Sequence, residues 1–169
     1  MTLFALDHNY PAPIIERAKP FLSDVELAFI GEIDPRLPEF DDWELLLALH
    51  HHPRKWDGII SNDTSMLDQE RELAVLGYTH LTLVAPVAAG HDPIRSTGLV
   101  LAHIENVASQ TTSRKPQVWR LSGRTGSGQH PDQFIEKLAT KASRDPIDLR
   151  KKAMPSNAIL RKNPLAHAG

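Results

Sequence analysis

Short apolar runs alternate with helical patterns along the first half of the chain, and this alternation constrains the fold more than any other feature. The four runs are Leu3 to Leu6, Leu27 to Ile30, Gly58 to Ser61 and Leu81 to Val84. Short runs of this kind, partly β-branched and bounded by turn residues, are typical of strands buried on both faces of a sheet. Strands separated by helices need crossover connections, which leave the strands parallel and both faces covered.

The segments between these runs carry helical signals. Helices are expected over Pro11 to Ala18, Asp41 to His50, Ser65 to Leu76 with Gly77 as the residue after the helix, and Asp92 to Ala108 with Asp92 as N-cap. Right-handed crossovers between the strands are expected. The sequence therefore predicts an α/β fold, a three-layer α/β/α, Rossmann-like domain whose central parallel sheet has about four to five strands.

The charge changes sign along the chain, which divides it into two regions. Residues 1–110, the predicted α/β domain, hold 7 Lys/Arg and 17 Asp/Glu, whereas residues 111–169 hold 12 Lys/Arg and 4 Asp/Glu. This basic C-terminal extension contains a possible strand over Gln117 to Leu121 and a helix over Asp132 to Ala142. It is expected to pack on the body or on a second copy in a homodimer. One interpretation is that its basic residues contact phosphates. The alternative is that the extension is solvated or docks on a partner.

The composition excludes several classes of protein. No apolar run approaches the roughly 18 to 20 residues that span a bilayer, so no membrane partner is expected. The start of the chain lacks the features of a secretory signal, and the absence of cysteine excludes disulfides and thiolate zinc sites. A cytoplasmic location is expected.

Acidic residues follow two of the predicted strands at matching places. Asp7 comes directly after the first strand and Asp63 after the third, while Asp41 and Asp42 open a helix. Because the carboxyl ends of parallel strands share one edge of the sheet, these acids can meet there. Carboxylates held together repel one another unless a proton or cation lies between them, and Mg²⁺ or Mn²⁺ suits oxygen ligands. Such an ion can activate a water for attack on phosphorus.

Each acid also has a simpler structural explanation. Asp41 with Glu44 has the spacing of a capping box, Asp63 can cap the following helix, and Ser65 with Asp68 has the same spacing. For any one residue the capping explanation is the stronger. Capping does not, however, require acids at the ends of two equivalent strands, whereas metal binding does.

Three motifs resemble those of the PIN-like domain family, in the same order and over about residues 1–105. They are the segments Phe4 to Pro11, Asp42 to Leu46 and Gly58 to Asp63. The resemblance implies a metal-dependent ribonuclease acting on RNA, with Mg²⁺ or Mn²⁺ held by Asp7, Asp42 and Asp63 and with Asp41 and Asn9 orienting ligands or water. Asp41 is also a candidate metal ligand, because it stands seven residues before Ala48, a spacing that many family members show for the metal-site acid. Many members are toxins of toxin–antitoxin modules, which makes an antitoxin protein a further expected partner.

The chain also departs from that family. His8 stands where a Glu is common, and Ser65 stands where another acid is usual, although Asp68 or Glu70 can supply the missing carboxylate. These departures motivate an alternative, a non-catalytic PIN-like module that binds RNA or protein. Arg95 opens the helix after the fourth strand and is expected to bind substrate phosphate; the alternative there is an ordinary helix cap.

Overall fold

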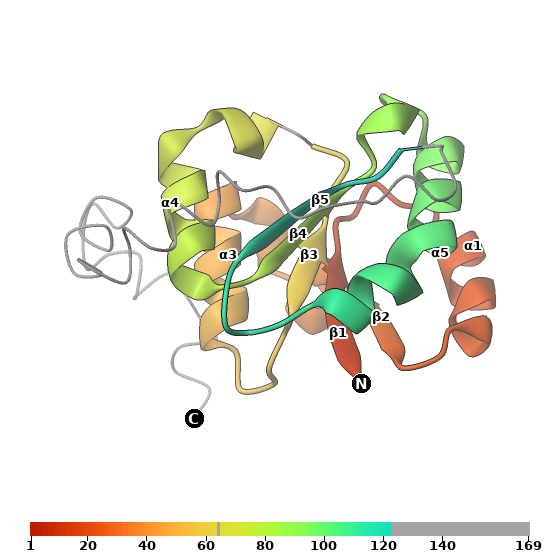
Figure 1. The fold of residues 1–169 in the computed structure, drawn as a ribbon, viewed down its shortest axis with the longest axis horizontal. Helices are drawn as coiled ribbons and strands as arrows, with labels where there is room; N and C mark the ends of the chain where they lie inside the picture. The colour runs from red at the N-terminus through yellow and green to blue at the C-terminus, as the bar shows by residue number, and fades with distance from the viewer. Residues whose placement is uncertain (64, 123–169) are drawn as a thin grey trace.

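A five-stranded parallel sheet forms the centre of the molecule in the computed structural model, which describes residues 1–63 and 65–122 (Figure 1). The strands lie in the order β2-β1-β3-β4-β5. Their bounds are β1 Thr2–Leu6, β2 Val25–Phe29, β3 Gly58–Ile60, β4 Thr82–Ala85 and β5 Gln117–Arg120. All five strands expected from the sequence are present, with small shifts at their ends.

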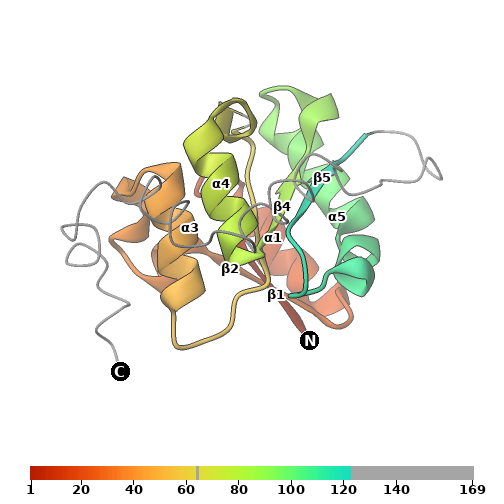
Figure 2. The ribbon, with the colours of Figure 1, turned by 60° about the vertical axis from the view of Figure 1, so that its left-hand side comes forward.

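Helices cover both faces of the sheet, so the three-layer α/β/α arrangement is confirmed (Figures 1 and 2). One face carries α3 (Asp42–His51) and α4 (Glu70–Thr79), and the other carries α1 (Ala12–Ala18) and α5 (Pro93–Gln110). The remaining pieces are short: η1 Lys19–Phe21, α2 Ile30–Ile33, η2 Leu37–Glu39, η3 Ser65–Asp68 and η4 Val87–Ala89.

Alternate residues of each strand point into different cores. Along β1, Ala5 belongs to the core beneath α3 and α4, whereas Phe4 and Leu6 belong to the core beneath α1 and α5. Along β3, Ile59 and Ile60 divide in the same way. Because β3 and β4 are buried on both sides, they appear in the sequence as largely apolar runs without alternation, whereas the edge strand β2 alternates buried and half-buried residues and includes Glu26.

The β4–α5–β5 connection does not follow the expected hand. The chain moves in one direction along the sheet from β2 to β3, β4 and β5, yet α5 packs on the face opposite to α3 and α4. This crossover therefore has the opposite hand to the other three, and the prediction that all crossovers share one hand was wrong. With only seven residues, α1 is too short to cover its face, and the eighteen-residue α5 covers the rest.

The segment after β3 also differs from the predicted single helix. A 3₁₀ turn, η3, comes first, the extended Gln69 interrupts the helical path, and α4 then continues to Thr79. Gly77 lies inside α4. The residue that follows the helix is His80, which adopts the left-handed conformation with φ 57°. Packing of buried residues such as Leu76 extends the helix beyond the glycine, because tertiary contacts outweigh local helix propensity.

The expected helix over residues 132–142 lies outside the described residues, and so does the expectation that it brings Lys137, Lys141 or Arg144 near the acidic edge of the sheet. Within the part of the chain that the structure describes, no helix is both long and apolar enough to cross a membrane.

Candidate functional site

The acidic residues meet where the strand order reverses. The first connection leads from β1 to β2 at one side, and the chain then returns past β1 to β3. In open α/β sheets the crevice at such a point, outside the carboxyl ends of the strands, is the usual ligand site. Asp7 follows β1 and Ser61 follows β3 at this point, and a cleft of about 150 Å³ lies there with Asp7, Asp42 and Asp63 in its lining.

The Asp7 carboxylate is held by local contacts. Its backbone amide donates to the Ile60 carbonyl at 3.1 Å, which extends the β1–β3 pairing by one residue beyond β1. Its Oδ1 accepts the His8 amide at 2.7 Å and lies 2.8 Å from His8 Nδ1. The side chain is 15% exposed. The carboxylate is thus oriented at the edge of the sheet while staying accessible from the cleft.

The Ser61 hydroxyl joins the two acids that follow the strands. It donates to Asp7 Oδ2 at 3.3 Å and accepts the backbone amide of Asp63 at 3.1 Å. Asp63 Oδ1 in turn accepts the Ser65 amide at 2.9 Å, which closes a local turn. The structural explanation of Asp63 as a turn-forming residue is therefore supported, and the same contacts place its carboxylate in the cleft.

Asp42 approaches the other two acids from α3, where it is the first helical residue. The extended Asp41 precedes it, and the acids of this first turn complement the positive end of the helix dipole. Burial raises the pKa of the half-buried Asp42 carboxyl to about 6, and the charges of Asp63 and Asp7 add to this effect. The raised pKa shows that the three acids share one electrostatic environment.

Glu72 is a buried acid that the sequence did not single out. It lies on α4 with a side chain only 3% exposed, and its Oε1 accepts the guanidinium of Arg71 at 2.9 Å. Arg71 also lies over the ring of Trp43, with Cζ 4.9 Å from the ring centroid. The Glu72 charge contributes to the raised pKa of Asp42. No local motif marks Glu72, because its position depends on how α4 packs against α3.

The other predicted site residues are placed less centrally. Asn9 lines the cleft beside Asp7 and His8. Asp41 is exposed, does not line the cleft and makes no side-chain cap hydrogen bond, so the capping-box explanation does not hold for it. Asp68 and Glu70 are exposed outside the cleft lining. They do not supply the missing carboxylate in this arrangement.

Arg95 lies on α5, which covers the opposite face of the sheet from α3, and it does not line the cleft. Asp92 caps this helix by accepting the amides of Ile94 and Arg95 at 3.0 and 3.3 Å. The ordinary-cap explanation therefore accounts for this segment. Arg95 is not among the described residues that line the acid cleft, so its position does not support the expected phosphate-binding role.

Apolar side chains also line the cleft. Among the described residues, the lining includes Ile30, Leu37, Pro38, Phe40 and Met66 and contains no lysine or arginine. Leu37, Pro38 and Phe40 follow a turn that Arg36 stabilises, because its guanidinium donates two hydrogen bonds to Asp34 at 3.0 and 2.9 Å. A ligand in this cleft thus meets both carboxylates and apolar side chains.

The donor set fits a hard cation by its chemistry. Three carboxylates and the Asn9 amide offer oxygen ligands of the kind that Mg²⁺ and Mn²⁺ prefer. The pKa of Asp42 is raised first by burial and then by the neighbouring negative charges, which a cation would offset. Among residues 1–63 and 65–122, however, no three His, Cys, Asp or Glu side chains stand in an arrangement that could hold a metal ion.

Comparison with models of known families, with curated proteins and with solved structures finds no match for this chain.

Proposed function

We propose that this protein is a divalent-metal-dependent ribonuclease that hydrolyses RNA phosphodiester bonds. The observation that supports it most is the convergence of Asp7, Asp42 and Asp63 on one cleft at the point where the strand order reverses. The acids come from two strand ends and a helix start, so they serve no single local structural purpose. Their clustering has a cost in repulsion, which a bound Mg²⁺ or Mn²⁺ offsets.

The roles of the residues follow from their contacts. Asp7, Asp42 and Asp63 would hold the ion, which when bound supplies a Lewis acid for phosphoryl oxygens and an activated water. Ser61 keeps the Asp7 carboxylate and the Asp63 backbone in register through its hydroxyl. Asn9 lies in the cleft lining, where its amide can orient a water or a phosphate oxygen.

Cleavage assays on matched variants test this proposal. Purified Asp7→Asn and Asp42→Asn proteins should each lose Mn²⁺-dependent cleavage of single-stranded RNA by at least about a hundredfold, since each change removes a ligand charge. Asp68→Asn is the control, because it removes the same charge from an exposed position outside the cleft. Cleavage that persists in Asp7→Asn and Asp42→Asn, after contaminating nuclease is excluded, would contradict the proposal.

The second candidate function is a non-catalytic module of the same fold that binds RNA or protein. The absence, among the described residues, of three acidic or imidazole groups arranged around a common ion favours it. Thermal unfolding with and without Mn²⁺ separates the two candidates. A nuclease site should raise the wild-type stability by about 3 kcal/mol at a metal concentration 100 times Kd, and Asp63→Asn should abolish the gain. A wild-type protein that binds RNA without any response to millimolar Mn²⁺ would support the module.

A further inference from the structure

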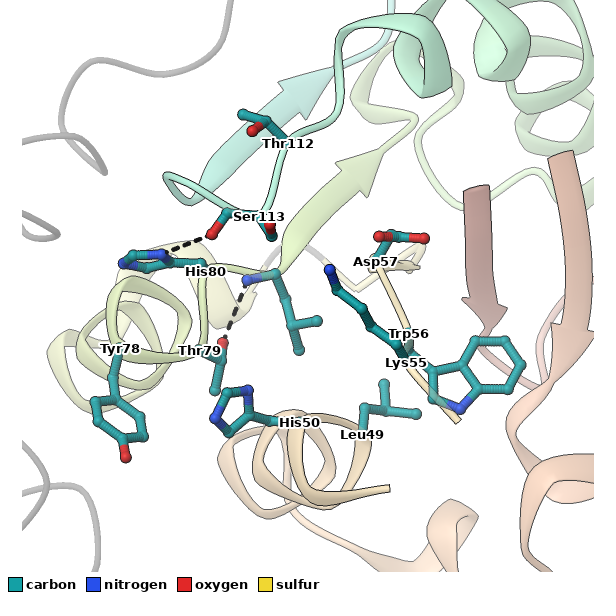
Figure 3. Close-up of a pocket in the computed structure, with 11 residues that line it drawn as sticks. Leu49, His50, Lys55, Trp56, Asp57, Tyr78, Thr79, His80, Thr112 and Ser113 are labelled. Atoms are coloured by element: carbon teal, nitrogen blue, oxygen red, sulfur yellow. Dashed lines mark hydrogen bonds between the residues drawn. The ribbon is translucent and has the colours of Figure 1, made fainter. Parts of the chain in front are cut away.

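A second cavity lies at the opposite edge of the sheet from the acid cleft. It has a volume of about 280 Å³, near the lower end of the range for small-molecule sites. Its lining comes from four segments that meet before the strands begin: the end of α3, residues 55–57 before β3, the end of α4 and residues 112–113 before β5 (Figure 3). The acid cleft, by contrast, lies beyond the carboxyl ends of β1 and β3. The cavity is therefore a separate site.

Two opposite charges line this cavity without pairing with each other. Lys55 and Asp57 are two residues apart in the sequence, and Figure 3 shows the Lys55 side chain extending into the space while the Asp57 carboxylate lies at one side of it. Among the described residues, neither forms an ion pair within 4.0 Å. Asp57 Oδ2 accepts the Leu3 amide at 2.9 Å, which keeps this carboxylate in place.

Local hydrogen bonds fix the rest of the lining. A ring nitrogen of His80, Nδ1, lies 2.9 Å from the Ser113 carbonyl oxygen, which ties the end of α4 to the turn before β5. Thr112 Oγ1 accepts the Arg114 amide at 3.2 Å within that turn. The Thr79 hydroxyl is engaged by the backbone, since it donates to the Leu76 carbonyl and accepts the Leu81 amide. The cavity is thus preformed, which lowers the cost of ordering on binding.

Apolar side chains form part of the lining, beside His50 and Tyr78. Leu49, Trp56 and Leu81 are all buried and contribute to the same cavity. An inorganic anion would leave this surface in contact with water or empty space. A small organic molecule would cover it, so the lining favours a ligand with a carbon skeleton.

We propose that this cavity binds a small organic anion that carries an amino or hydroxyl group close to its carboxylate or phosphate head. The Lys55 ammonium pairs with the anionic head, and Asp57 accepts a hydrogen bond from the amino or hydroxyl group. The carbon skeleton covers Leu49 and Leu81. A ligand with both groups bridges the two charges, which form no ion pair among the described residues, whereas a bare anion meets the repulsion of Asp57. The proposal does not depend on the nuclease proposal.

Amide NMR titrations of the full-length protein test the proposal with matched probes. Acetate is compared with glycolate and glycine, and inorganic phosphate with glycerol 3-phosphate, at constant ionic strength so that screening does not change. At least one hydroxylated or amino probe should give saturable shifts at the amides of residues 55–57, 79–81 and 112–113, with an affinity at least about threefold higher than its bare counterpart. The two series show whether the head is a carboxylate or a phosphate.

Substitutions at Lys55 and at a remote lysine complete the test. Lys55→Met should weaken binding at least about tenfold, whereas Lys55→Arg, which retains the charge, should keep most of it. Lys19→Met is the matched control, because Lys19 pairs with Glu16 on the surface near α1, away from the cavity. Both lysines are on the protein surface, so the variants should fold, as their amide spectra will show.

The proposal fails in any of three cases. No probe gives saturable shifts at the cavity amides up to ~50 mM, or the bare anions bind as well as their hydroxylated or amino counterparts. In the third case Lys55→Met and Lys19→Met lose affinity equally, which indicates a response to net charge instead of a site.

Discussion

Replacing Asp42 by asparagine should stabilise the metal-free protein. The Asp42 carboxyl has a pKa of about 6 in the folded state, against an ordinary value of 3.8. The difference is about two pKa units, and one unit corresponds to about 1.4 kcal/mol, which gives an upper limit of about 3 kcal/mol. Because Asp42 is half-buried, solvent screens part of this cost, and we expect a gain of about 1 to 2 kcal/mol for the variant at neutral pH.

The gain should depend on pH in a defined direction. Between pH values of about 4 and 6 the folded state keeps a proton on Asp42 that the unfolded chain has lost, so the stability of the wild type falls as the pH rises through this window. Asparagine carries no charge at any pH. The advantage of Asp42→Asn should therefore be absent below pH 4, grow between about pH 4 and 6, and stay constant above that range.

Urea unfolding monitored by tryptophan fluorescence, with EDTA present throughout, measures this difference at several pH values. Asp41→Asn is the control, because this neighbour is exposed and makes no side-chain cap hydrogen bond, and its effect should stay within about 0.5 kcal/mol. A variant that is no more stable than the wild type at neutral pH would refute the reasoning. So would a gain that persists unchanged below pH 4, since the charge on Asp42 could not then be its cause.

Four other substitutions test further contacts in the structure. Ser61→Ala removes the hydroxyl that bridges the two acids after β1 and β3, and it should lower stability by about 1 to 2 kcal/mol in urea unfolding and reduce any nuclease activity. Gly58→Ala places a Cβ 2.2 Å from the Thr82 carbonyl oxygen, so it should cost about 3 kcal/mol or more, whereas Gly98→Ala, with nothing within 4 Å, should raise the melting temperature through helix propensity. Arg36 holds the pKa of Asp34 below its ordinary value, chiefly through their side-chain hydrogen bonds. Arg36→Gln should therefore reduce stability at neutral pH, and titration under denaturant should show this loss fading as the pH falls through the pKa of Asp34.

The sequence by itself determined the order and type of the main elements. The strands at Thr2–Leu6, Val25–Phe29, Gly58–Ile60 and Thr82–Ala85 could be predicted because a strand buried on both faces must be apolar at successive positions. The same apolar runs predicted where β1 and β3 end, and therefore that Asp7 and Ser61 follow these ends. One further rule predicted that these two ends lie close together: parallel strands place their carboxyl ends at the same edge of the sheet.

The tertiary structure decided what depends on packing between distant segments. The face on which α5 lies depends on how much of the sheet the short α1 leaves uncovered, and that face separates Arg95 from the acid cleft. The burial of Glu72 depends on the contact of α4 with α3, as does the end of α4 beyond Gly77. Local sequence encodes propensity and periodicity, whereas the burial and electrostatic environment of a carboxylate depend on residues far away in the chain. The raised pKa of Asp42 and the meeting of Lys55 and Asp57 in one cavity therefore become apparent only in the folded protein.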